Sequence, residues 1–114
     1  MNLTVYHLKT CDTCRKAIKS LEGADHEVTL IDVRADGVPS EKLRALAEAV
    51  GYDALLNTRS TTWRNLPDEE KTSLDEVGKL ALLQTHPTLI KRPVIERGEH
   101  VTVGWSPAIQ AEFL

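Results

Sequence analysis

The sequence predicts an α/β domain whose sheet contains a parallel pair of strands and an antiparallel hairpin. Within the first 33 residues, a segment rich in β-formers, a segment of helical period and a second β-rich segment follow one another. Near the C-terminus, two short β-rich segments flank a turn at Gly98-Glu99. With 114 residues and 41% hydrophobic residues, the chain is long enough for one core, so we expect a single domain over residues 1–114.

The first half of this pattern is a strand–helix–strand unit. Residues 3–8 alternate and predict a strand, and residues 28–31 predict a second one within 26–33. Between them a helix is expected from Cys14 to about Leu21, and either Thr10 or Thr13 can cap it. A crossover of this kind places its two strands parallel.

A mostly helical segment follows, at about residues 40–86. A helix is expected from Ser40 to Val50, where Gly51 ends it, whereas residues 52–66 show no clear period. The acidic residues 68–70 favour a further helix start, since carboxylates stabilise the positive end of the helix dipole. This helical pattern continues to Pro87, and we expect a break near Gly78.

The last part of the chain returns to the sheet. Residues 89–95 lead into a strand, and residues 101–103 form its antiparallel partner after the Gly98-Glu99 turn. Ser106-Pro107 starts a short final helix, because proline is favoured at the first helical position. The complete sheet therefore has four strands of mixed direction.

Composition excludes several classes of protein. The net charge of −3 argues against general nucleic-acid binding, which needs an excess of Lys and Arg. The apolar runs are too short to span a bilayer. The N-terminal residues lack the pattern of a secretory signal, and the chain carries two cysteines rather than a disulfide framework. We therefore expect a cytoplasmic protein.

The two cysteines form one Cys-x-x-Cys, at Cys11 and Cys14. Cys11 lies between the end of a strand and the start of a helix, where unpaired backbone N–H groups and the helix dipole favour a thiolate. We predict that Cys11 is a nucleophile of low pKa and that Cys14 is a resolving or modulating thiol. Nearby cations add positive charge against Asp12, namely Lys9, Arg15 and Lys16.

Two other interpretations of the cysteine pair remain open. A Cys-x-x-Cys is also half of a zinc site, but none of the four histidines is paired at ligand spacing, so redox chemistry without a metal is favoured. Cys14 also fits the apolar face of the predicted helix, where it would simply pack in the core.

Longer motifs resemble one family. These motifs are Leu-Leu-Asn-Thr-Arg at 55–59 with Trp63-Arg64, and Pro-Thr-Leu-Ile-Lys-Arg-Pro-Val at 87–94. They resemble the arsenate reductase (ArsC)/Spx family, which implies a thioredoxin-like fold from residue 3 to about 112. The stretches Lys-x-Cys-Asp-Thr, Asn-Thr-Arg-x-Thr-Thr-Trp-Arg and Ile-Lys-Arg-Pro are most similar to the short YffB-like branch.

The resemblance implies roles for individual residues. Cys11 matches the catalytic cysteine, and Pro93 matches a proline that follows a cis peptide bond. Arg59 and Arg92 match two arginines that hold an oxyanion, a task suited to planar guanidinium groups. Without the resemblance, ordinary surface ion pairs would explain these arginines. The substrate-binding residues expected on this basis are Arg59, Arg92, Pro93, Thr10 and Thr13.

One part of the pattern differs from the reductases. Their third arginine follows a glycine just before a proline, whereas this chain has Trp105 in Gly-Trp-Ser-Pro at 104–107. One cation fewer makes a poorer site for a multiply charged oxyanion, and a bulky indole suits glutathione better. Trp63 and Trp105 also fit ordinary packing in the core or at its rim.

The function implied by the resemblance is a glutathione-dependent thiol oxidoreductase that acts on a disulfide or a small oxyanion. Glutathione would be its co-substrate and glutaredoxin a further partner. Two alternatives remain: an Spx-like redox-sensing regulator that binds RNA polymerase, and a true arsenate reductase. None of these three hypotheses implies direct contact with nucleic acid or membrane.

Overall fold

The computed structural model describes residues 2–71 and 75–114. Its contacts divide the chain into two compact units. The sheet unit comprises Met1–Gly37 and Arg92–Leu114, and the helical unit comprises Val38–Lys91. The helical unit corresponds to the predicted insertion at residues 40–86, while the single domain expected over residues 1–114 stays a prediction.

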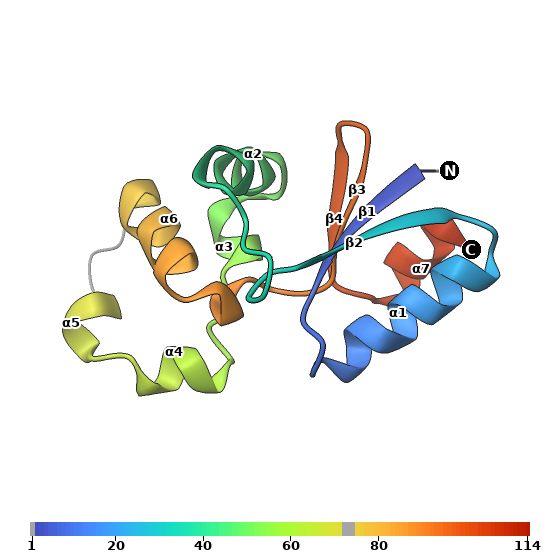
Figure 1. The fold of residues 1–114 in the computed structure, drawn as a ribbon. Coiled ribbons are helices and arrows are strands. Elements are labelled where there is room, and N and C mark those ends of the chain that lie inside the picture. Colours follow the sequence, from blue (N-terminus) through green and yellow to red (C-terminus); the bar gives the residue numbers. More distant parts are fainter. Residues whose placement is uncertain (1, 72–74) are drawn as a thin grey trace. The chain divides into compact units, whose positions relative to one another are not determined.

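The sheet unit contains a mixed four-stranded sheet in the order β2-β1-β3-β4 (Figure 1). β1 pairs with β2 in parallel, and β3 pairs with β1 and β4 in antiparallel fashion. This arrangement confirms the predicted parallel pair and hairpin. The bounds of the strands are β1 Asn2–His7, β2 Glu27–Asp32, β3 Val94–Arg97 and β4 His100–Val103.

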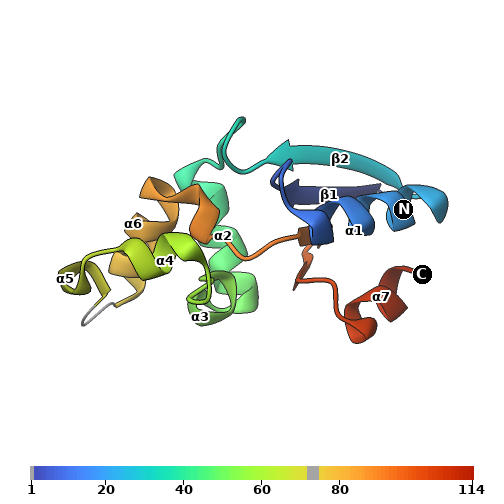
Figure 2. The ribbon, with the colours of Figure 1, turned by 90° about the horizontal axis from the view of Figure 1, so that it is seen from below.

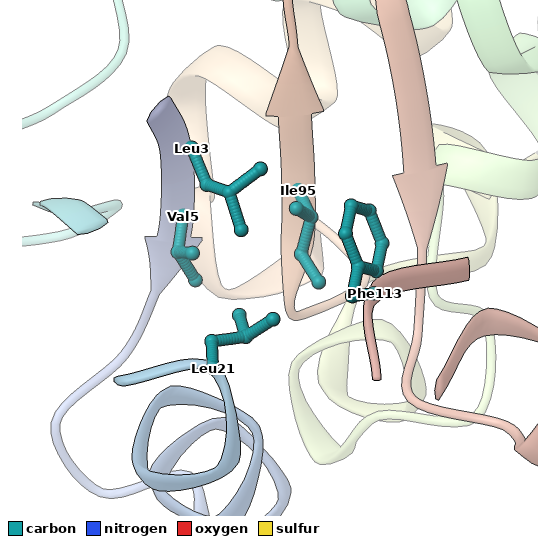
Figure 3. Packing of buried hydrophobic residues seen from close by; sticks show 5 residues of the cluster. All are labelled: Leu3, Val5, Leu21, Ile95 and Phe113. Carbon is teal, nitrogen blue, oxygen red and sulfur yellow. The ribbon is translucent and has the colours of Figure 1, made fainter. Parts of the chain in front are cut away.

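Two helices of the sheet unit contribute to its core, α1 (Asp12–Gly23) and α7 (Pro107–Phe113). Figure 2 shows α1 running along β1 and β2. Leu21 of α1 and Phe113 of α7 meet side chains of β1 and β3 in one buried cluster (Figure 3). The strand members of the cluster are Leu3, Val5 and Ile95. Alternation along β1 places Leu3 and Val5 on the same side of the sheet, so this face is apolar and covered.

Helix α1 begins earlier than predicted and is capped differently. The prediction that Thr10 or Thr13 caps it is wrong, because the cap residue is Cys11, whose sulfur accepts the backbone N–H of Cys14. The helix ends at Gly23, and Asp25 beyond it has a φ of +65°. An aspartate tolerates this left-handed conformation better than most residues do.

The helical unit consists of short elements around α2 and α6. α2 packs against α3 and α6, and α4 packs against η1. The Leu56–Ile90 bridge and the hydrogen bond from the Lys91 N–H to the Leu55 carbonyl join its early and late segments. Its elements are α2 Ser40–Val50, α3 Tyr52–Leu55, α4 Thr61–Asn65, α5 Asp68–Lys71, α6 Glu76–Thr85 and η1 Pro87–Leu89.

The helical pattern breaks at Asp75, close to the predicted position, and Gly78 itself lies inside α6. Asp75 caps this helix, and its Oδ1 atom accepts the Gly78 N–H at 2.8 Å. The middle of the predicted acidic helix, at residues 72–74, lies outside the described residues. None of the helices that the structure describes is long and apolar enough to cross a membrane.

Replacing Leu21 tests the importance of the core beneath the sheet. Leu21 is fully buried, so Leu21→Ala should lower the free energy of unfolding in urea by about 3 kcal/mol. Leu30 is 45% exposed, and Leu30→Ala, the matched control, should cost only about 0.5 kcal/mol. Equal losses in the two variants would contradict this assignment of the core.

Candidate functional site

Cys11 lies where the chain turns from β1 into α1. Its backbone N–H donates to the Leu8 carbonyl at 2.9 Å, and its own carbonyl accepts the Arg15 N–H at 3.1 Å. Its Sγ atom accepts the Cys14 N–H at 3.3 Å. The sulfur therefore occupies the N-terminal end of a 12-residue helix, where the helix dipole favours a negative charge.

The surroundings of Cys11 act on its pKa in opposite directions. Partial burial raises the pKa, since burial disfavours the charged form. Hydrogen bonds from the Cys14 thiol and backbone, together with the charge and hydrogen bonding of Arg92, lower it. Together, the effects that lower the pKa of Cys11 exceed the effect of burial. The pKa therefore lies below the usual range, and the thiolate is enriched at neutral pH.

Cys14 has the opposite character. Its side chain is fully buried, and both cysteines are free thiols. Burial, followed by the hydrogen bond and charge of Cys11, raises the pKa of Cys14 to about 12. Cys14 therefore stays protonated at neutral pH and acts on Cys11 as a hydrogen-bond donor. This position bears out the packing interpretation of Cys14, while its service as a resolving thiol stays a prediction.

Arg92 and Pro93 approach Cys11 from the start of β3. The Arg92–Pro93 peptide bond is cis, as the resemblance implies for Pro93. Arg92 is hydrogen-bonded to Cys11 and stabilises its charged form. Pro93 is buried, and its carbonyl accepts the Gly104 N–H at 2.8 Å. That bond ties the residue before β3 to the residue after β4.

Asp32 is a residue of this site that the sequence analysis missed. It ends β2 and is 5% exposed, and its carboxylate accepts the N–H groups of Lys9 at 3.3 Å and of Arg34 and Ala35 at 2.8 Å each. These bonds, the one from Ala35 foremost, hold the pKa of Asp32 below its usual range despite burial. Asp32 therefore anchors the Lys9–Cys11 loop to the end of the neighbouring strand. The available signal was an aspartate directly after a β-rich segment.

The other predicted residues lie on the surface or in other roles. Thr10 and Thr13 are exposed beside Cys11. Arg59 belongs to the helical unit, where it is exposed before α4 and its N–H donates to the Asn57 Oδ1 at 3.1 Å. The substrate-binding roles of these three residues stay predictions. Trp105 packs against the core cluster. The Lys71 Nζ atom lies 5.7 Å from the centre of the Trp63 ring.

Within residues 2–71 and 75–114, no three or more His, Cys, Asp and Glu side chains are grouped so that they could hold a metal ion. The described site offers the Cys11 thiolate and, beside it, the Arg92 cation.

A mixed sheet with an activated cysteine at the start of its first helix and a cis-proline before its third strand defines a thioredoxin-like thiol protein. The chain belongs to the ArsC family, whose model matches residues 6–113. This match confirms the resemblance that the motifs carried and, with it, a family of thiol oxidoreductase type.

Individual relatives agree with this assignment. An uncharacterised protein of Haemophilus influenzae is 43% identical over 104 residues, which cover 91% of each chain. A solved structure of a protein named YffB superposes with a TM-score of 0.92 at 35% identity and covers 98% of each chain. The global transcriptional regulator Spx of Staphylococcus haemolyticus is 26% identical over 98% of this chain and 86% of its own.

The activation of Cys11 is testable through its reaction with iodoacetamide. The inflection in the alkylation rate against pH should lie below the value of about 8.5 for a free thiol. Arg92→Gln should move this inflection upward, because it removes a cation that stabilises the thiolate. Arg34→Gln removes an exposed cation outside these contacts and should leave it in place. A wild-type inflection at or above that of free cysteine would contradict the activation.

The anchoring role of Asp32 predicts a pH-dependent loss of stability. Asp32→Asn should lower the free energy of unfolding at pH 7 by about 1–3 kcal/mol, since a buried ionised acceptor is lost. Because the folded-state pKa is lowered, this contribution is complete above the unfolded pKa of about 3.9 and disappears as the pH falls through the folded-state value.

Urea unfolding of both proteins between pH 3 and pH 7 measures this dependence. Asp25→Asn, at an exposed position, serves as the control and should change stability by only about 0.5 kcal/mol. A difference between wild type and Asp32→Asn that stays constant with pH would show that the charge of Asp32 is not involved.

Proposed function

We propose that this protein is a glutathione-dependent thiol oxidoreductase in which Cys11 alone forms the covalent intermediate. The observation that carries the proposal is the unequal pair of cysteines. Cys11 is partly accessible and activated by Cys14 and Arg92, whereas Cys14 is fully buried with a raised pKa. A buried thiol that stays protonated is a poor second nucleophile, so an external thiol is required to complete the reaction.

The proposed cycle begins with a mixed disulfide between glutathione and a substrate thiol. The Cys11 thiolate attacks the glutathione sulfur, the substrate thiolate leaves and takes up a proton, and a Cys11–glutathione disulfide forms. A second glutathione thiolate then attacks the glutathione sulfur of that disulfide. Oxidised glutathione is released and the Cys11 thiolate returns. One added glutathione is oxidised for each substrate thiol released, and it leaves joined to the glutathione that the mixed disulfide already carried.

The site also assists the departure of Cys11 in the second step. Arg92 is hydrogen-bonded to Cys11, and the N-terminus of α1 provides a further N–H donor at the same sulfur. These groups stabilise negative charge on Cys11, which makes Cys11 a good leaving group in the second step. The same features that activate Cys11 as a nucleophile therefore also favour its regeneration. Such a cycle suits a cytoplasmic protein, where glutathione is abundant and reduced.

Two alternatives have weaker support. Arsenate reduction would use Arg59 and Arg92, and glutaredoxin would recycle the enzyme, but the place of the third arginine is taken by Trp105, which packs against the core. Regulation through RNA polymerase is suggested by the similarity to Spx and by the Cys11–Cys14 spacing. Co-purification with polymerase subunits under oxidising conditions would favour that alternative.

Substitution of each cysteine tests the monothiol cycle. In an assay that follows glutathione-dependent reduction of the mixed disulfide of 2-mercaptoethanol and glutathione, Cys11→Ser should abolish turnover. Cys14→Ala, the matched control, removes the thiol donor but keeps the backbone N–H to Cys11, and should retain turnover within about tenfold of wild type.

Intact mass after incubation with oxidised glutathione provides a second measurement. Wild type and Cys14→Ala should each gain one glutathione, and Cys11→Ser should gain none. Full turnover by Cys11→Ser would end the proposal, and complete loss of turnover in a folded Cys14→Ala protein would show that Cys14 is the required second nucleophile.

A further inference from the structure

The exposed surface around Cys11 is positively charged, although the chain as a whole carries a net charge of −3. Four cationic side chains occur within eleven residues of sequence, and all four are exposed. They are Lys9, which precedes α1, and Arg15, Lys16 and Lys19 on α1, and we call these four cations the α1 stripe. The function proposed above uses none of these four side chains.

The spacing of the α1 stripe aligns it with the reactive sulfur. Cys11, Arg15 and Lys19 are separated by four residues each, so they lie above one another on one side of α1. Lys16 follows Arg15 on the adjoining part of the exposed surface. At about 1.5 Å per residue, the stripe extends roughly 12 Å from Cys11 along the helix. This length matches three or four residues of an extended polypeptide.

Nearby carboxylates leave most of this charge uncompensated. Asp12 forms an ion pair with Arg15 and neutralises that cation. The Asp32 carboxylate is directed to three backbone N–H groups. Among residues 2–71 and 75–114, no carboxylate forms an ion pair with Lys9, Lys16 or Lys19. Burial of Cys14, Ala17 and Leu21 on the other side of α1 keeps Lys16 and Lys19 turned outward.

We propose that the substrate is a polypeptide whose glutathionylated cysteine is flanked by Asp and Glu residues, and that this acidic segment binds along the α1 stripe. The proposal rests on the function given above and specifies the class of its substrate. Complementary charge raises the rate of encounter and fixes the direction of the bound segment. A neutral or basic segment gains nothing here, and a basic one is repelled by Lys16 and Lys19.

The covalent chemistry is unchanged by this choice of substrate. The Cys11 thiolate attacks the glutathione sulfur of the peptide disulfide, the peptide thiolate leaves and is protonated, and a further glutathione regenerates Cys11 with release of oxidised glutathione. One added glutathione is consumed for each peptide thiol released, and it leaves joined to the glutathione that the peptide carried. The acidic residues of the peptide take no part in bond changes, so their effect falls on kcat/KM through binding and encounter.

Two glutathionylated peptides of equal length test the proposal. One carries two Asp and two Glu next to its cysteine, and the other carries Lys and Arg at the same positions. The wild-type protein should reduce the acidic peptide with a kcat/KM roughly tenfold higher at low ionic strength. In about 0.5 M salt this preference should largely disappear, because surface charges are then screened.

Charge reversal on α1 provides the decisive variants. Lys16→Glu with Lys19→Glu should abolish or invert the preference for the acidic peptide, whereas Lys16→Arg with Lys19→Arg should retain it. Arg44→Glu with Arg64→Glu changes the net charge equally on α2 and α4 and should also retain the preference. If this last pair removes the preference as well, net charge rather than the α1 stripe is responsible, and the proposal is overturned.

A small substrate that lacks an acidic segment separates failure of this proposal from failure of the proposed function. Turnover of the mixed disulfide of 2-mercaptoethanol and glutathione depends on Cys11 and involves no acidic segment. It should persist in all three double variants, and each peptide rate is compared with it. Equal rates for both peptides with normal turnover of the small disulfide would overturn the substrate class alone. Loss of all turnover in wild type would overturn both.

Discussion

The structure of this site depends on one hydrogen bond, from the Cys14 N–H to the Cys11 sulfur. Cysteine is not among the residues that usually cap a helix, where Ser, Thr, Asp and Asn stabilise the first turn better. A thiolate, however, is a charged acceptor, and the same N–H groups that need a partner at the start of α1 stabilise it. The capping of α1 and the activation of Cys11 are therefore one interaction, and each is strongest when the sulfur is ionised.

The sheet topology brings the other contributors to the same end of the structure. β1 and β2 are parallel, so Cys11 after β1 and Asp32 at the end of β2 lie at the same end of the two strands. β3 is antiparallel to β1, so Arg92, which lies shortly before β3, is at that end of the strands as well. Residues separated by as much as 81 positions in sequence thus meet because two strands end and one begins there. The cis Arg92–Pro93 bond and the Asp32 bond to Lys9 then fix the two segments beside Cys11.

Sequence patterns were informative where local preference and tertiary packing agree. The alternation at residues 3–8, the helical period at 40–50 and the Gly98-Glu99 turn each appear in the structure almost as predicted. The short helices α3 and α4 were missed because four or five residues cannot show a period. The break predicted near Gly78 falls at Asp75, because the cap by Asp75 and the packing of α6 outweigh the cost of about 1 kcal/mol for a glycine inside the helix. Asp32 was missed since its partner Lys9 is 23 residues away.

The Cys-x-x-Cys spacing did not by itself distinguish between two uses of the second cysteine. In this helix the third position after the cap turns toward the interior, where Cys14 joins Ala17 and Leu21 on the buried side. Burial raises the energy of a Cys14 thiolate, and this keeps its proton available to Cys11. The two thiols therefore have complementary roles. Because Cys14 keeps its proton and donates it in a hydrogen bond, Cys11 loses its own proton more readily. An arrangement of this kind favours a single attacking sulfur and leaves the second disulfide exchange to a thiol from solution.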